Sequence, residues 1–92
     1  MQIDPTDPLS HYGVGLECLN QSLVDEAIAA FDGAIHANAN YSAAYYHKAR
    51  AQIAAGRNDD ARATLDAGMK IAKAAGDWHT QTEMASLLET IE

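Results

Sequence analysis

Several residue types are scarce in this chain, and each shortage excludes a class of structure. Of the 92 residues, one is cysteine and two are proline. A single cysteine can form neither an internal disulfide nor a zinc site built on cysteines. No apolar run approaches the ~20 residues that a membrane-spanning helix needs. The opening stretch, MQIDPTDPLS, has neither the basic region nor the apolar core of a signal peptide. We therefore expect a cytoplasmic protein that has no membrane partner.

Positive charge is scarce as well. Six lysines and arginines stand against thirteen aspartates and glutamates, which gives a formal net charge of −7. Such a chain would repel phosphate groups, so nucleic acid is not an expected partner. The few cations are also unevenly placed. None precedes Lys48, all six lie between Lys48 and Gly76, and the stretch that begins at Asp77 is acidic again.

This distribution of charge allows three interpretations. Unlike charges along a binding groove would orient a ligand, with Arg50 and Lys48 pairing with a carboxylate and Glu17 with a cation. Unlike ends of the molecule would associate head to tail in an assembly. The third interpretation is an ordinary solvated surface, which is the usual role of charge runs.

No arrangement of reactive side chains points to catalysis. The histidines never fall at the three- or four-residue spacing that places two metal ligands on one helix face; they are His11, His36, His47 and His79. Cys18 and His11 would share a helix face, but that face is expected to pack inward, where a cysteine is inert. Gly13 and Gly15 match part of a dinucleotide-binding motif without the strand that must precede it. We expect no enzyme activity, no cofactor and no metal.

Local signals predict five helices joined by short turns. Hydrophobic residues make up 48% of the chain, which suits a compact helical protein. The expected N-terminal caps are Asp7, Ser22 (with Asp25 in capping-box spacing), Asn40, Asn58 and Asp77, and the expected terminating glycines are Gly56 and Gly76. The helices are expected at about 8–20, 22–37, 41–55, 58–76 and 77–91.

Two segments repeat each other at a distance of 34 residues. DEAIAAFDGAI begins at Asp25, and DDARATLDAGM begins at Asp59. At that distance small residues align with small ones and large with large; the pairs are Gly15 with Ala49, Ala27 with Ala61, Phe31 with Leu65, and Ala34 with Gly68. Small residues let two helices approach closely, and the large residue fills the space beside them. A period of this length predicts a helical solenoid made of stacked hairpins.

The spacing of these residues resembles the tetratricopeptide repeat (TPR) family. It is similar in particular to small bacterial two-repeat proteins whose capping helix opens with Gly-Asp, here Gly76-Asp77. The resemblance implies an all-α solenoid of five antiparallel helices in a single domain. The implied boundaries are 1–92 for the domain, about 8–41 and 42–75 for the repeats, and about 77–91 for the capping helix. Departures from the family pattern are His11, Cys18, Gln52, Ala39 and Lys73.

The first expected helix carries two apolar stripes. One consists of Leu9, Tyr12, Leu16 and Leu19, and the other of His11, Val14, Gly15 and Cys18. The second stripe resembles the packing positions of the family and should face Ala27 and Phe31, which leaves the first stripe without an internal partner. In TPR proteins this side lines a concave groove that holds a peptide or a helix. By resemblance, the groove residues are Leu9, Tyr12, Leu16, Leu19, Asn20, Tyr46, Arg50 and Ile53.

The expected function is a non-enzymatic adaptor or scaffold that binds a partner protein in this groove. In a different interpretation the same apolar stripe closes a homodimer. In a third, Leu9, Leu16 and Leu19 belong to the core and are partly covered by the N-terminal segment. Some TPR proteins bind chaperone tails through a clamp of Lys, Asn and Arg. Tyr12 and Leu16 stand at the matching places here, so that ligand is not expected.

The last expected helix carries Trp78 with Met84, Leu88 and Ile91 along one side. The simplest interpretation is that this stripe docks the helix onto the second repeat. The alternative places Trp78 at an outer interface.

Overall fold

The structure, a computed structural model, describes residues 6–91. The first five residues of the stretch MQIDPTDPLS, about which the sequence raised an expectation, lie outside this range. Between residues 6 and 91 there is no strand, and every helix end lies within two residues of its expected place, so the all-α fold is confirmed. The helices are α1 (Pro8–Asn20), α2 (Val24–Ala37), α3 (Ser42–Ala54), α4 (Asn58–Ala75) and α5 (Trp78–Glu89).

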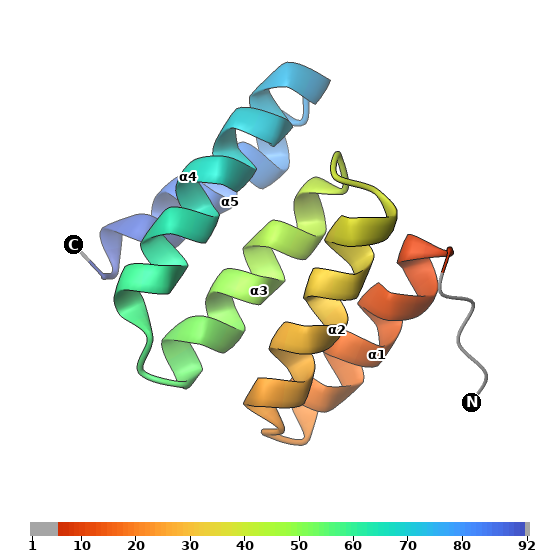
Figure 1. The fold of residues 1–92 in the computed structure, drawn as a ribbon. Helices are drawn as coiled ribbons and strands as arrows, with labels where there is room; N and C mark the ends of the chain where they lie inside the picture. Colours follow the sequence, from red (N-terminus) through yellow and green to blue (C-terminus); the bar gives the residue numbers. More distant parts are fainter. Residues whose placement is uncertain (1–5, 92) are drawn as a thin grey trace.

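Consecutive helices run antiparallel and pack side by side (Figure 1). α1 pairs with α2 and α3 pairs with α4, while α2 packs on α3 and α4 packs on α5. The odd-numbered helices also touch in succession, because α3 contacts both α1 and α5. Among the described residues, no Cα atom of α1 or α2 lies within 8 Å of one in α4 or α5. Contact between neighbours alone is the arrangement of a solenoid.

Close packing inside each hairpin depends on a missing side chain. A Cβ atom on Gly15 would lie 2.5 Å from Cε1 of Phe31, and one on Gly68 would lie 2.6 Å from Cβ of Tyr45. Phe31 and Leu65, the paired large residues of the two repeats, are both fully buried. The 34-residue alignment of small and large residues therefore describes real helix–helix contacts.

Aspartates cap the first and last helices as expected. Oδ1 of Asp7 accepts a hydrogen bond from the backbone N–H of Leu9 at 3.0 Å. Oδ1 of Asp77 accepts one from the backbone N–H of Thr80 at 3.2 Å. Each bond satisfies a donor that the helix itself leaves free. Gly76 ends α4 with a φ of 72°, a left-handed conformation that glycine adopts without steric penalty.

The expected caps of the three middle helices are wrong. The residues at their N-cap positions are Leu23, Tyr41 and Arg57, and none of these side chains accepts a capping hydrogen bond from a backbone N–H of its helix. The expected caps were Ser22, Asn40 and Asn58. Acidic residues in the first turn of α2 and of α4 supply negative charge near the partial positive charge of those two helix ends.

Ser22 fails as a cap because it occupies the turn between α1 and α2. Its φ is 61°, and it stands 34 residues before Gly56, whose φ is 76°. The N–H of the next residue, Leu23, donates to the carbonyl of Cys18 at 2.8 Å and closes the end of α1. The equivalent bond after Gly56 has the same length of 2.8 Å. Ser22 therefore holds a left-handed turn position that suits glycine.

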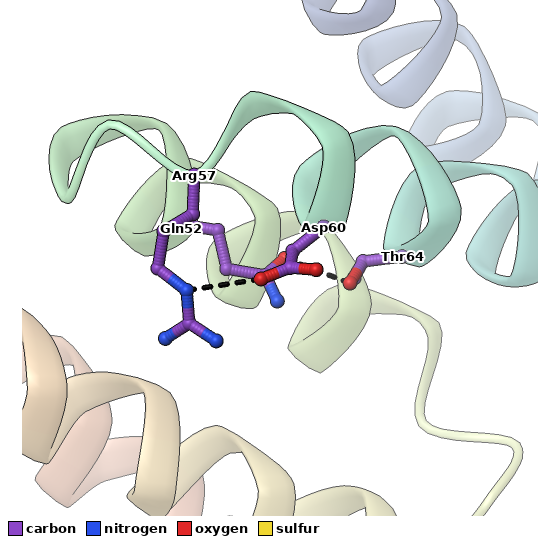
Figure 2. A network of polar contacts seen from close by, with 4 residues as sticks. All are labelled: Gln52, Arg57, Asp60 and Thr64. Carbon is purple, nitrogen blue, oxygen red and sulfur yellow. Dashed lines mark hydrogen bonds and ion pairs between the residues drawn. The ribbon is translucent and has the colours of Figure 1, made fainter.

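A buried polar pair joins α3 to α4 at a position where the family pattern has tyrosine. Oγ1 of Thr64 donates to Oε1 of Gln52 at 2.7 Å, and both residues are buried (Figure 2). Figure 2 also shows the bond from Nε of Arg57 to Oδ2 of Asp60, 3.0 Å long, which lies exposed at the start of α4. The buried polar atoms of this pair are thus satisfied by their mutual hydrogen bond.

An aromatic cluster joins the first repeat to the second. The ring centroid of His47, on α3, lies 5.4 Å from that of Tyr12, 5.9 Å from that of Phe31 and 5.1 Å from that of Tyr46. The ring centroid of Tyr12 also lies 5.2 Å from that of Tyr41. These separations are typical of stabilising ring contacts. His47 therefore stands at the centre of the contact between α1, α2 and α3.

The surroundings of His47 favour its neutral form. Its Nδ1 atom is buried and has no hydrogen-bond partner among residues 6–91. Burial lowers the pKa of His47 below its usual value, and the positive charge of Arg50 lowers it further, while Glu83 acts in the opposite direction.

None of the helices within residues 6–91 combines the length and the apolar character needed to cross a membrane.

We expect Ser22→Gly to raise the free energy of unfolding by about 0.5–1 kcal/mol. Relief of the roughly 1–2 kcal/mol left-handed penalty exceeds the extra chain entropy that glycine brings to the unfolded state. Urea denaturation measures the change. Ser86→Gly, inside α5, is the control and should lower stability by about 0.5–1 kcal/mol. A loss of stability in Ser22→Gly would contradict the turn assignment.

We expect Thr64→Val to destabilise the protein by about 1–3 kcal/mol, because it leaves the Gln52 amide oxygen buried without its donor. Adding Gln52→Met should recover most of that loss, since both polar partners are then gone. A double-mutant cycle of thermal or urea unfolding tests this. If the losses of stability measured for Thr64→Val alone and for Gln52→Met alone simply add in the double variant, the two side chains are not coupled.

We expect stability to fall as the pH is lowered from about 7.5 to about 5.5. The pKa of His47 is lower in the folded state, so its contribution is fully present above the unfolded-state pKa of ~6.5 and is lost as the pH falls through the folded-state pKa. His47→Phe keeps a ring in the cluster and should flatten this pH dependence, while the other histidines remain. An unchanged slope in the variant would show that another group is responsible.

Candidate functional site

A hollow of about 340 Å³ lies between α3 and α5. One wall is Tyr46 of α3, and the other residues come from α5 and the turn after it: His79, Thr82, Glu83, Ser86, Leu87 and Thr90. A ring, a carboxylate and several hydroxyl groups thus face one space. The hollow lies on the side of the molecule where α3 contacts α5.

Asp77 fixes α5 beside α3 at one end of this hollow. While Oδ1 caps α5, Oδ2 accepts a hydrogen bond from Oγ of Ser42 at the start of α3, at 2.7 Å. Hydrogen bonds from Thr80 and Ser42 hold the pKa of Asp77 below its usual value, so the carboxylate stays charged. At the other end, Nη2 of Arg62 donates to the carbonyl of Ile91 at 2.9 Å. Both ends of the wall formed by α5 are therefore held in place.

The wall on α3 consists of a tyrosine with a cation over its ring. Cζ of Arg50 lies 5.9 Å from the ring centroid of Tyr46, within the range of a cation–π interaction. Tyr46 is half-buried and Arg50 is exposed. Both were predicted as groove residues, and the structure brings them together beside the hollow.

Glu83 supplies the negative charge of the hollow. Its Oε1 lies 2.6 Å from Nε2 of His79, one turn earlier on α5, and 40% of its side chain is exposed. Burial raises the pKa of Tyr12, and the phenolate of Tyr41, when ionised, and the negative charge of Glu83 raise it further. Because Glu83 also raises the pKa of His47, its field reaches both α1 and α3.

The prediction that the α1 stripe lacks an internal partner is wrong for three of its four members. Tyr12, Leu16 and Leu19 are partly buried and pack against a core cluster of Ala27, Ile28, Phe31 and Ala51. Ala51 belongs to α3, so the second hairpin covers the stripe. Leu9 is the exception, with 63% of its surface exposed. Asn20, the last residue of α1, is also exposed.

Ile53, the remaining predicted groove residue, also packs inward. It lies against a second core cluster, formed by Ala49, Ala61, Leu65, Ala72 and Met84. Among the predicted residues, Tyr46 lines the hollow, Arg50 lies beside it, Leu9 and Asn20 are exposed elsewhere, and the others contribute to the core.

The charged residues proposed for a polarised groove are used differently. Nζ of Lys48 lies 2.6 Å from Oδ1 of Asp32, so it forms an ion pair between α3 and α2. Oε1 of Glu17 accepts a hydrogen bond from Nε2 of Gln21 at 2.8 Å on the exposed end of α1. Arg50 keeps its place near the hollow, but the carboxylate there is Glu83.

Trp78 does not dock α5 onto the second repeat, as first expected. It is 61% exposed at the first residue of the helix. Docking is done by Met84, which is fully buried, together with Leu87, Leu88 and Ile91. Trp78 is therefore available at the surface, which the alternative interpretation, an outer interface, requires.

The residues of α5 that line the hollow were missed because this helix was read only as a cap. Its sequence carried a signal, however. His79, Thr82, Glu83, Ser86 and Thr90 follow one another at steps of one, three or four and form a polar stripe beside the apolar one. In residues 6–91 no three side chains of His, Cys, Asp or Glu are grouped so that they could hold a metal ion. The site thus offers recognition by shape, ring contacts and charge.

Comparison with known proteins agrees with this architecture. The tetratricopeptide repeat profile matches residues 21–87. A tetratricopeptide repeat domain protein from Salinibacter ruber, solved by NMR in solution, is 27% identical, with a TM-score of 0.87 over 98% of this chain and 91% of that one. A crystal structure of a tetratricopeptide repeat domain protein from the same organism is 25% identical, with a TM-score of 0.84 over 92% and 94%. No curated protein matches the sequence. The chain belongs to the tetratricopeptide repeat family.

Proposed function

We propose that this protein is a non-enzymatic adaptor that binds a peptide or a helix of another protein along α3 and α5. Tetratricopeptide repeats generally mediate protein–protein interactions. The observation that carries the proposal is the hollow of about 340 Å³ between the two helices, with Tyr46 as its wall and Arg50 over the ring. Tyrosine and arginine are among the commonest energetic anchors of interfaces.

The proposal moves the binding face toward the C-terminal half of the chain. Leu16 and Leu19 pack internally, so they offer a partner only their outer edges. Arg50 is exposed and suits a carboxylate of the partner. Leu9 and Asn20 would extend the contact along α1 for a longer ligand.

Self-association is a second candidate, and a specific observation supports it. Leu9 and Trp78 are large apolar residues with 63% and 61% of their surfaces exposed, and each lies at the N-terminal end of an odd-numbered helix. A second copy of the chain would cover them. A homodimer would find less apolar surface on α1 than the sequence indicated, because the rest of the α1 stripe is already half-buried.

We expect peptides selected from a displayed library on the wild-type protein to lose about tenfold or more in affinity on Tyr46→Ala and on Arg50→Glu. Arg50→Glu changes an exposed side chain, whereas Tyr46→Ala also removes a ring that packs against His47 and the second core cluster. Thermal unfolding of both variants therefore accompanies the binding measurement. Arg57→Glu, at the start of α4, makes the same change of charge elsewhere and serves as the control. Peptides whose binding is insensitive to Tyr46 and Arg50 would contradict the proposed face.

Solution mass by light scattering separates the two candidates. A monomer across the concentration range supports the adaptor. A dimer that Leu9→Lys splits would favour self-association, and Leu9 is the suitable position because its exposed side chain can change without opening the core.

A further inference from the structure

We propose that the hollow between α3 and α5 is a subsite for a lysine or arginine side chain of the partner, with Glu83 as its counter-ion and the ring of Tyr46 as its wall. This inference rests on the proposed function and specifies which chemistry the partner presents. It differs from the expectation drawn from the sequence, in which Glu17 on α1 received the cation.

The negative charge of Glu83 is only partly neutralised within the protein. Within residues 6–91, the other ion pairs join an aspartate to a lysine or an arginine. Glu83 is paired instead with His79, which carries a compensating charge only when it is protonated. The carboxylate is 40% exposed, so a ligand can reach it without displacing core side chains. It therefore keeps capacity for an external cation.

The other side chains that line the hollow also suit a cation. Tyr46 supplies an aromatic ring, and Thr82, Ser86 and Thr90 supply hydroxyl oxygens that accept hydrogen bonds. A ring beside a carboxylate suits an ammonium or guanidinium group, because the ring face and the anion both attract positive charge. The volume of about 340 Å³ accommodates one long side chain.

The negative charge of Glu83 also acts beyond the hollow. It adds to the rise in the pKa of Tyr12 on α1 that burial causes, and it opposes the lowering of the pKa of His47 on α3. Its charge therefore acts on side chains of two other helices. An approaching cation is attracted before it enters the hollow.

Arg50 is the internal competitor of this subsite. Its guanidinium group already lies 5.9 Å from the Tyr46 centroid, which shows that a cation can be placed over the ring. Because like charges repel, the ligand's cation should enter from the α5 side. Removal of Arg50 should tighten the binding of a small cation, whereas a peptide that also presents a carboxylate loses Arg50 as a binding partner.

A second hollow serves as an internal reference. It has a volume of about 450 Å³, lies between α4 and α5, and is lined by Asp66, Met69, Lys70, Lys73 and Gln81. Two lysines against one aspartate give it the opposite balance of charge. A cationic probe should therefore leave it unaffected.

The test is an NMR titration of the isotope-labelled chain with Nα-acetylarginine methylamide. The neutral analogue Nα-acetylcitrulline methylamide is the matched probe, since it has nearly the same shape without the charge. We expect saturable shifts for Tyr46, Glu83 and Ser86 with the arginine probe, at least about fivefold weaker binding of the citrulline probe, and loss of the shifts at about 0.5 M salt. Resonances of Lys70 and Lys73 should stay in place.

Two variants decide whether Glu83 is the counter-ion. Glu83→Gln should weaken binding of the arginine probe at least about fivefold. Glu89→Gln removes the same charge from an exposed position of the same helix and should leave binding unchanged. Arg50→Ala should bind the probe more tightly. Equal binding of the two probes, equal effects of the two glutamine variants, or shifts confined to other surfaces would overturn the proposal.

The outcome is separable from that of the proposed function. Should the arginine probe fail while library peptides still depend on Tyr46 and Arg50, the adaptor stands and only its preference for a cation is wrong. Should both fail, the α3–α5 face is not the binding face.

Discussion

The close contact of paired helices at Gly15 and Gly68 is the constraint on which the rest of the structure depends. Any side chain there would collide, Gly15 with the ring of Phe31 and Gly68 with Tyr45 or Met84. With no side chain, the two helices of each hairpin approach closely and bury one large residue between them. A hairpin built in this way still has an uncovered apolar side, and the next hairpin covers it. The stacking of two hairpins and a final helix follows from that need.

Stacking also decides what remains available for binding. The apolar stripe on α1 meets α3, so most of it becomes core, and the ring of Tyr12 joins the cluster around His47. The next helix in this succession, α5, is joined to α3 at its start by the Ser42–Asp77 hydrogen bond, and its Met84 packs into the core cluster that includes Ala49 of α3. A hollow remains between the polar side chains of α5 and Tyr46. The helix that ends the solenoid therefore does more than cover the second repeat. It forms half of the candidate site, and Asp77 positions it.

Much of this was predictable from the sequence, because the relevant signals are local or periodic. Asp7-Pro8, Gly76-Asp77 and the 34-residue period place the helices and pair their large and small residues. Ser22 was misread because it matches a capping motif, although its alignment with Gly56 pointed to a left-handed turn. The covering of Leu16 and Leu19 was not predictable in the same way. A stripe shows that a helix face is apolar, but it does not show whether a later helix covers that face.

The charges illustrate the same limit. The acidic first half and basic middle of the chain suggested a polarised groove, yet Lys48 joins Asp32 across the two hairpins and Arg62 bonds to Asp59 and the Ile91 carbonyl. Internal pairing thus uses part of the contrast that the sequence displays. The charged groups that remain available to a binding partner are those whose contacts inside the protein are weak. Arg50 over a ring and Glu83 beside a histidine are such groups. Glu83 lines the hollow from α5, and Arg50 lies over the Tyr46 ring that lines it from α3. The binding chemistry is therefore a property of the packed helices more than of the charge blocks along the chain.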